Sequence, residues 1–133
     1  MKATLLCDPK PRLRIEQTGA RAIPVCFRGA AVQGCAVLDG PVREVDIAAC
    51  PAWIYWNSNG SGYYRTVWSA GQLKGLLDAG LTALTLAEKL TLVEDLRAQK
   101  ASGAEVKALL LKLSNEAEPV VASTAFAALR VVP

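Results

Sequence analysis

Histidine is absent from the 133 residues of this chain. Its absence excludes, within this sequence, the Ser-His-Asp and Cys-His catalytic systems and zinc sites built on histidine ligands. A cysteine that has no neighbouring base is a poor nucleophile. The sequence therefore predicts no catalytic, metal-ligating or cofactor-binding residue in this chain.

Charged residues are also scarce. They make up 20% of the chain, whereas hydrophobic residues make up 52%. The net charge of +3 includes no run of basic residues, which argues against a nucleic-acid or lipid-headgroup binder. No apolar run approaches the roughly 18 residues of a membrane helix, so we expect no membrane span. The apolar excess predicts a packed core or a surface that another element covers.

Four cysteines are present, Cys7, Cys26, Cys35 and Cys50, and their spacing matches neither a zinc knuckle nor a C-x-x-C motif. Cysteine is commonly either buried as a free thiol or paired. Two interpretations therefore stay open: four free thiols, or one or two disulfides.

The first half of the chain has the pattern of short strands. Apolar and charged residues alternate over 12–16 and 42–47, and apolar runs cover 22–27 and 32–38. Pro24 predicts a sheet edge or a bulge, because proline has no amide to donate to a ladder. Residues 52–68 predict a last hairpin around a turn of Asn, Ser and Gly. Short strands separated by turns predict an antiparallel β-sandwich over 1–68.

From Ser69 onward the apolar residues recur with helical spacing. Three apolar faces are expected: Leu73, Leu76 and Leu77 in a first helix; Leu86, Leu90, Val93 and Leu96 in a second; Val106, Leu109, Leu110 and Leu113 in a third. Gly80 predicts a C-terminal cap for the first helix. Residues 85–88 form a capping box, and residues 102–105 repeat that start signal.

A fourth helical segment begins at Pro119, which suits a first helical turn. Residues 119–132 carry a single charge, Arg130. Such a segment predicts a buried helix or an edge without its neighbour, so self-association through it is expected. Short loops predict antiparallel helices. The predicted fold class is α+β in sequence order, with a small antiparallel β-sandwich over 1–68 and a HEAT-like helical segment over 69–133.

Six of the eight aromatic residues lie within residues 52–68. Aromatic platforms stack sugars or single-stranded bases, so a carbohydrate-binding sandwich is one hypothesis. The preferred prediction is interior packing, because aromatic side chains dominate small cores. For Arg65 the preferred role is to join the last strand to the first helix, with a carboxylate clamp as the alternative. Asp95 is expected on a solvated face or beside an arginine.

The segment Trp53-Ile54, followed by Asn57 and then by 62–65 (Gly-Tyr-Tyr-Arg), fits the pattern W-(I/V)-x-x-N-x-x-x-x-G-Y-Y-R. It resembles the aminopeptidase N-like gluzincin family, in which this stretch ends a small β-sandwich just before a helical domain. Three further stretches resemble family motifs in the same order: 23–26 resembles W-x-I-P-V, Leu13 with Gln17 resembles L-x-x-x-Q, and 84–90 with Asp95 resembles L-x-x-x-E-R-x-x-L-x-x-D. The chain departs from the pattern at Ala22, where the family has Trp, at Lys89, where it has Arg, and in a shorter loop at 18–21.

The resemblance implies a non-catalytic part of a zinc aminopeptidase-like protein, namely its sandwich domain (1–68) and the start of a larger helical domain (69–133). The structural motif would consist of Trp53, Asn57, Gly62, Tyr63, Tyr64 and Arg65. The family's H-E-x-x-H zinc motif and G-x-M-E-N substrate motif are absent from this sequence. Zinc and peptide hydrolysis would then belong to another part of the polypeptide, which would be the partner of this chain. The alternative is a stand-alone protein-interaction module.

Overall fold

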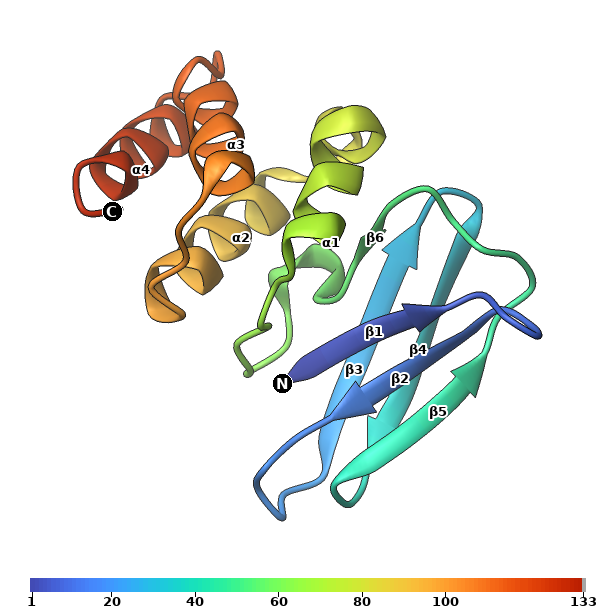
Figure 1. Cartoon of the computed structure of the whole chain (residues 1–133). Helices are drawn as coiled ribbons and strands as arrows, with labels where there is room; N and C mark the ends of the chain where they lie inside the picture. Colours follow the sequence, from blue (N-terminus) through green and yellow to red (C-terminus); the bar gives the residue numbers. More distant parts are fainter. Residues whose placement is uncertain (133) are drawn as a thin grey trace.

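The computed structural model of the chain describes residues 1–132, with the strands at one end of the molecule and the helices at the other (Figure 1). The strands are β1 (Lys2–Leu6), β2 (Arg12–Glu16), β3 (Ile23–Gly29), β4 (Val32–Leu38), β5 (Val42–Asp46) and β6 (Ile54–Tyr55). The helices are α1 (Ala70–Gly75), α2 (Leu86–Ala98), α3 (Ala104–Ser114) and α4 (Pro119–Leu129), with short helical turns η1 (Ser58–Gly60), η2 (Leu76–Gly80) and η3 (Leu81–Ala83). The predicted α+β class with the β-part first is confirmed.

The six strands form two antiparallel sheets of three strands, ordered β1-β2-β5 and β4-β3-β6. The alternation that predicted β2 places Leu13 and Ile15 in the interior, where both are fully buried. Val25 and Leu38 of the other sheet pack against Ile15. β1 had no clear sequence pattern and was not predicted.

Pro24 lies where β3 has a strand on one side only. β3 pairs with β4 along its whole length, but its pairing with β6 covers only Arg28 and Gly29. The missing amide of Pro24 therefore interrupts no ladder. The predicted edge position of this proline is confirmed.

The predicted hairpin over 52–68 is wrong. β6 is two residues long and pairs with β3, and residues 63–68 form only an isolated bridge between Val67 and Lys2. The physical reason is that side chains bind this segment instead of a strand partner. Asn57 closes the preceding loop, and Asp95 of α2 accepts hydrogen bonds from Thr66 and Trp68.

The first helix does not end at Gly80 as a left-handed cap. The helical path continues through η2 and η3 to Ala83, and Gly80 has a right-handed φ of −104°. Gly80 is needed for close packing: a Cβ built there would lie 2.6 Å from the ring of Trp53. A glycine is needed at this position, but the reason is the neighbouring indole ring of Trp53 and not a helix cap.

The other helix signals had mixed outcomes. Thr85 and Glu88 form the predicted capping box at α2, and Pro119 occupies the first turn of α4. The repeat of this signal at 102–105 is wrong, because α3 begins after Gly103, at a φ of 114°, without a side-chain cap. The buried face of α3 is confirmed in full.

The buried face of α2 is rotated from the predicted one. Leu86 is 48% exposed and Leu90 is only partly buried, while Leu92 joins Val93 and Leu96 in the core. The rotation also buries Glu88 and Asp95, the two acidic residues of α2 that form the junction described below. Pattern reasoning missed it because it assigned carboxylates to solvent.

One cluster of buried hydrophobic residues runs from the sheets through α4. It includes Leu13 of β2, Trp56, and Ala125 of α4. Two disulfides, Cys7–Cys50 and Cys26–Cys35, decide between the two cysteine interpretations in favour of pairing. None of the helices described within residues 1–132 is long and apolar enough to cross a bilayer.

The contact between Gly80 and Trp53 gives a matched pair of substitutions. Gly80→Ala should lower the free energy of unfolding by about 1–3 kcal/mol, because a methyl group there overpacks the site. Gly71→Ala, where the added Cβ meets nothing within 4 Å, should be neutral or stabilising by up to about 1 kcal/mol. Urea unfolding of both variants measures the difference, and equal effects would contradict this packing role.

Candidate functional site

The carboxylate of Glu88 lies at the centre of the junction between the strands and the helices. Its side chain is fully buried, and it accepts hydrogen bonds from the amides of Thr85 (2.9 Å) and Asn59 (2.9 Å). It also accepts from Nε of Arg28 at 2.8 Å and from a terminal nitrogen of Arg28 at 2.5 Å. One side chain therefore binds the start of α2, the η1 turn and β3.

Arg28 extends this connection to two further elements. Its guanidinium also donates to the carbonyl of Ala83, at the end of η3, and lies 5.6 Å from the centre of the Trp53 ring. A guanidinium suits this position because it presents five donors in one plane and stacks on aromatic rings. Arg28 thus joins β3 to Trp53, directly before β6, and to Ala83, at the end of η3.

The pKa of Glu88 reflects competing influences. Burial alone would raise the pKa of this carboxyl, but the hydrogen bonds from Arg28 and from the amides of Asn59 and Thr85 lower it below its usual value. A depressed pKa means that the group stabilises the fold above its unfolded pKa. This contribution is lost as the pH falls through the folded pKa.

Asp95, two turns further along α2, is the second buried acidic residue. Only 1% of its surface is exposed, which corrects the prediction of a solvated face or an arginine partner. It accepts hydrogen bonds from the amide of Thr66 at 3.3 Å and from the indole nitrogen of Trp68 at 3.2 Å. The bond from Thr66 satisfies a backbone amide in a segment that meets β1 only at the bridge between Val67 and Lys2.

Burial raises the pKa of Asp95 to about 6, although the hydrogen bonds from Trp68 and Thr66 and the charge of Arg65 act in the opposite direction. Because this pKa is above the unfolded value, the folded state binds a proton that the unfolded state has already released. The stability should therefore fall as the pH rises from about 4 towards 7.

The loop before this segment is closed by Asn57. Its side-chain oxygen accepts from the amide of Gly62 at 2.8 Å, and its nitrogen donates to the Gly62 carbonyl at 3.3 Å. Gly62 has no room for a side chain, because a Cβ would lie 2.2 Å from the ring of Tyr64. The Tyr64 hydroxyl donates to the carbonyl of Trp56 at 2.5 Å. The prediction of Asn57 and Gly62 as turn formers agrees with these bonds.

The six aromatic residues of 52–68 are not all interior. Tyr64 is half-buried, and Tyr63 is fully exposed. The remaining four are buried: Trp53, Tyr55, Trp56 and Trp68. Interior packing is thus the correct interpretation of most of the cluster, and Tyr63 is the exception.

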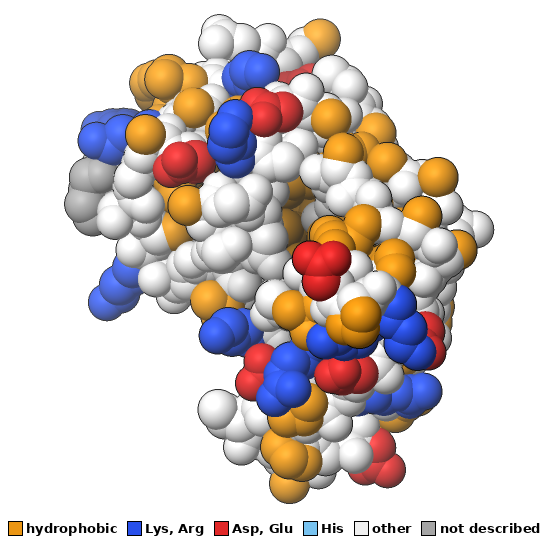
Figure 2. All heavy atoms as spheres, turned by 45° about the vertical axis from the view of Figure 1, so that its right-hand side comes forward, with side chains coloured by type: hydrophobic (Ala, Val, Ile, Leu, Met, Phe, Trp, Pro, Cys, Tyr) orange, Lys and Arg blue, Asp and Glu red, His pale blue; other side chains and the backbone are white. Residues whose placement is uncertain are grey.

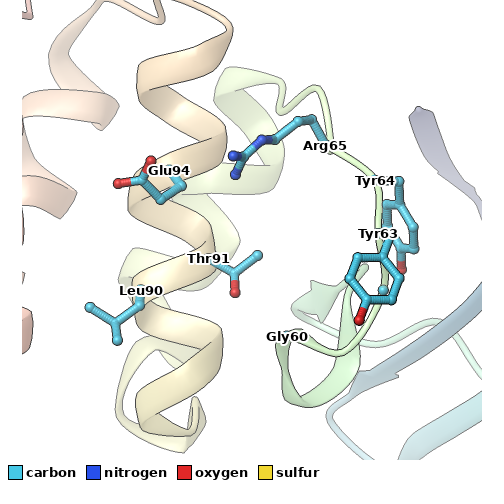
Figure 3. Close-up of a pocket in the computed structure, with 8 residues that line it drawn as sticks. Gly60, Tyr63, Tyr64, Arg65, Leu90, Thr91 and Glu94 are labelled. Carbon is cyan, nitrogen blue, oxygen red and sulfur yellow. The ribbon is translucent and has the colours of Figure 1, made fainter.

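Tyr63 and Arg65 border an open depression of about 510 Å³ between the 60–65 segment and α2. Figure 3 shows the Arg65 side chain extending towards α2, from which Thr91 points back towards the loop. Arg65 is exposed. Within residues 1–132 its guanidinium makes no hydrogen bond or ion pair to another residue, so it does not join strand and helix as predicted. Only its carbonyl takes part in the fold, accepting from Met1.

The described part of the chain brings together no group of three His, Cys, Asp or Glu residues that could hold a metal ion. The sequence has no histidine. These residues therefore do not fit a zinc centre, and the location of zinc in another part of a longer polypeptide stays a prediction. What the junction can do chemically is hold two carboxylates in fixed positions between sheet and helix.

Sequence reasoning missed Arg28 and the buried role of Asp95. The apolar run that predicted this strand ends at residue 27, yet Arg28 lies within β3. A single arginine in an otherwise apolar run indicates a partner carboxylate when a capping glutamate is also present. For Asp95 the available signal was the pair of tryptophan and threonine at 66–68, whose N–H groups need acceptors once buried.

Replacing the central carboxylate tests its pairing with Arg28. Glu88→Gln keeps an acceptor for the helix cap but removes the charge, so the free energy of unfolding should fall by about 2–4 kcal/mol. Asp78→Asn, which disrupts an exposed pair with Lys74, should change it by less than about 1 kcal/mol. Chemical denaturation at neutral pH measures both, and similar small losses would show that the buried pair contributes little.

The raised pKa of Asp95 predicts a specific pH dependence. Between pH 4.5 and 7 the unmodified chain should lose stability by an amount on the order of 2 kcal/mol through this group. Asp95→Asn should remove that slope, whereas Glu94→Gln, on the half-exposed side of α2, should retain it. Urea midpoints at four pH values measure the slopes, and an unchanged slope in Asp95→Asn would exclude this assignment.

Comparison with known proteins adds no relative: no protein-family model matches the chain, and a search of curated proteins finds no significant match.

Proposed function

We propose that this chain is the non-catalytic sandwich and first helices of a zinc aminopeptidase-like protein. In this role it braces the catalytic domain and helps to enclose the peptide chamber. The proposal rests on the resemblance of residues 13–95 to four motifs of that family. Zinc and the hydrolysis of N-terminal residues belong to the part of the polypeptide that carries H-E-x-x-H.

The observation that supports the proposal most is the contact between two of the four motifs at the junction. Glu88, from the helical motif, binds the amide of Asn59 inside the Trp53-to-Arg65 motif. Asp95, from the same helical motif, binds Thr66 and Trp68 directly after it. Residues that recur together in a family at distant sequence positions have a physical reason to do so when they bind one another.

The other matched residues also have structural positions. Leu13 is fully buried, and the side-chain nitrogen of Gln17 donates to the carbonyls of Arg21 (2.7 Å) and Gly40 (2.9 Å). Leu84 and Leu92 are buried on either side of Glu88 in the sequence. Lys89, which replaces the family's arginine, pairs with Glu116 at 2.6 Å. This distribution suits a module whose role is support.

A second candidate is a protein-interaction module that uses α4. This helix has no charged residue, and its outer side chains Val120 and Phe126 are 52% and 60% exposed. Such a surface favours contact with another protein or with a second copy of this chain. In the first proposal, the same surface would be covered by the following helices of the larger domain.

The complete reading frame around this chain separates the two candidates. The aminopeptidase proposal expects an H-E-x-x-H motif upstream, and it expects the complete polypeptide to release N-terminal residues from short peptides in a zinc-dependent assay. Glu88→Gln in that polypeptide should reduce the temperature at which activity is lost, with little change in activity at low temperature. A reading frame without any such motif would contradict the proposal and favour the interaction module.

A further inference from the structure

The side chains of Tyr63 and Arg65 make no hydrogen bond to another residue within the described part of the chain. Along 63–68, exposed residues alternate with buried or half-buried ones. Tyr64 and Thr66 face inward, whereas Tyr63 is fully exposed and Arg65 projects into the open depression beside α2 (Figure 3). Large aromatic and arginine side chains displayed together in this way are typical of binding hot spots.

The backbone that presents these two side chains is held on both sides. Before them, Asn57 binds Gly62 through two hydrogen bonds, and Tyr64 binds the carbonyl of Trp56. After them, Asp95 binds Thr66 and Trp68. The entropic cost of ordering this segment on binding would therefore be small, because its backbone is already fixed.

The lining of the depression contains one basic and one acidic residue, Arg65 and Glu94. Glu94, on the far wall, is already paired with Arg97 at 3.3 Å. The guanidinium of Arg65 has its donors free of intramolecular hydrogen bonds in the described residues. A planar guanidinium matches a carboxylate in a two-point hydrogen bond.

Tyr63 also borders a second depression, of about 270 Å³, on its other side. The walls there are mainly apolar and include Ile23 and Pro24. A ligand that spans the ridge at Tyr63 would thus place an apolar group on one side and a charged group at Arg65. In an extended ligand, side chains at positions i and i+2 lie about 7 Å apart on one face.

We propose that Tyr63 and Arg65 form a docking site for an extended protein segment that carries an acidic side chain two residues from an apolar one. The carboxylate pairs with Arg65, and the apolar side chain packs on Tyr63 above Ile23 and Pro24. This site goes beyond the supporting role proposed above and does not depend on the identity of the longer protein.

Face-wide electrostatics do not supply the attraction. On the face shown in Figure 2, Lys and Arg side chains lie intermingled with Asp and Glu side chains. Several of these charges are paired, as in Lys10–Asp46 and Arg12–Glu44. Recognition at Tyr63 and Arg65 is expected to depend on one carboxylate.

A pair of peptides tests the proposal on the whole chain. The probes are the blocked pentapeptide acetyl-Gly-Leu-Gly-Glu-Gly-amide and the same peptide with Gln in place of Glu. Titrations followed by amide NMR spectra should shift the signals of residues 60–65 and 90–94. The Glu peptide should bind at least about tenfold more tightly than the Gln peptide.

Two variants and one control locate the effect. Arg65→Gln should abolish the preference for the Glu peptide, and Tyr63→Ala should weaken both peptides. Lys107→Gln removes the same charge from an exposed position on α3 and should leave both affinities unchanged. The NMR spectra of the free variants also show that the fold is intact.

Three results would overturn the proposal: equal binding of the two peptides, shifts that fall outside the two depressions, or a preference retained in Arg65→Gln. A thymidine oligonucleotide and a panel of oligosaccharides serve as competitors. If either binds at Tyr63 more tightly than the Glu peptide, the site is a stacking platform and the protein-segment assignment is wrong.

Discussion

The pairing of Arg28 with Glu88 is the interaction on which the arrangement of sheet and helices depends. A buried carboxylate is costly unless all of its acceptor positions are used. Here four N–H donors, from β3, the η1 turn and the start of α2, converge on Glu88. Because these donors come from three separate elements, the carboxylate is satisfied only when all three are in place. Satisfying one charge therefore fixes the geometry of the junction.

Asp95, the second buried acidic residue, has a different role. Residues 63–68 meet a strand only at the bridge between Val67 and Lys2, yet Thr66 and Trp68 are buried. Asp95 provides acceptors for Thr66 and Trp68, and this removes the cost of unpaired N–H groups. The carboxylate is itself unfavourably buried, as its raised pKa shows. Burying the Asp95 carboxylate is therefore unfavourable in itself, but it provides the acceptors that Thr66 and Trp68 need where the strand region ends.

Periodicity was sufficient for most of the fold and insufficient for the junction. β2, β4, α3 and the start of α2 follow from alternation, an apolar run, helical spacing and a capping box, because these are local properties of the chain. The hairpin at 52–68, the cap at Gly80 and the solvated Asp95 were wrong for one shared reason. Each depends on a group more than twenty residues away, such as Trp53 opposite Gly80, and no local pattern contains that information. At the candidate site the sequence identified Asn57 and Gly62 as turn residues. The pairing of Arg28 and the outward orientation of Tyr63 and Arg65 were seen only in the structure.

The shared core of the strands and helices has a thermodynamic consequence. The main cluster of buried side chains extends from Ala3 to Ala128, and a smaller one lies between the sheets at Ile15, Val25 and Leu38. Arg28 and Glu88 connect the two halves across sixty residues. Cutting the chain near Ser69 would leave an unpaired charge on each piece and expose part of the core. Cooperative unfolding in a single step is what such an arrangement produces. The change from strands to helices along the sequence is therefore a boundary in architecture, and a single unfolding transition is expected across it.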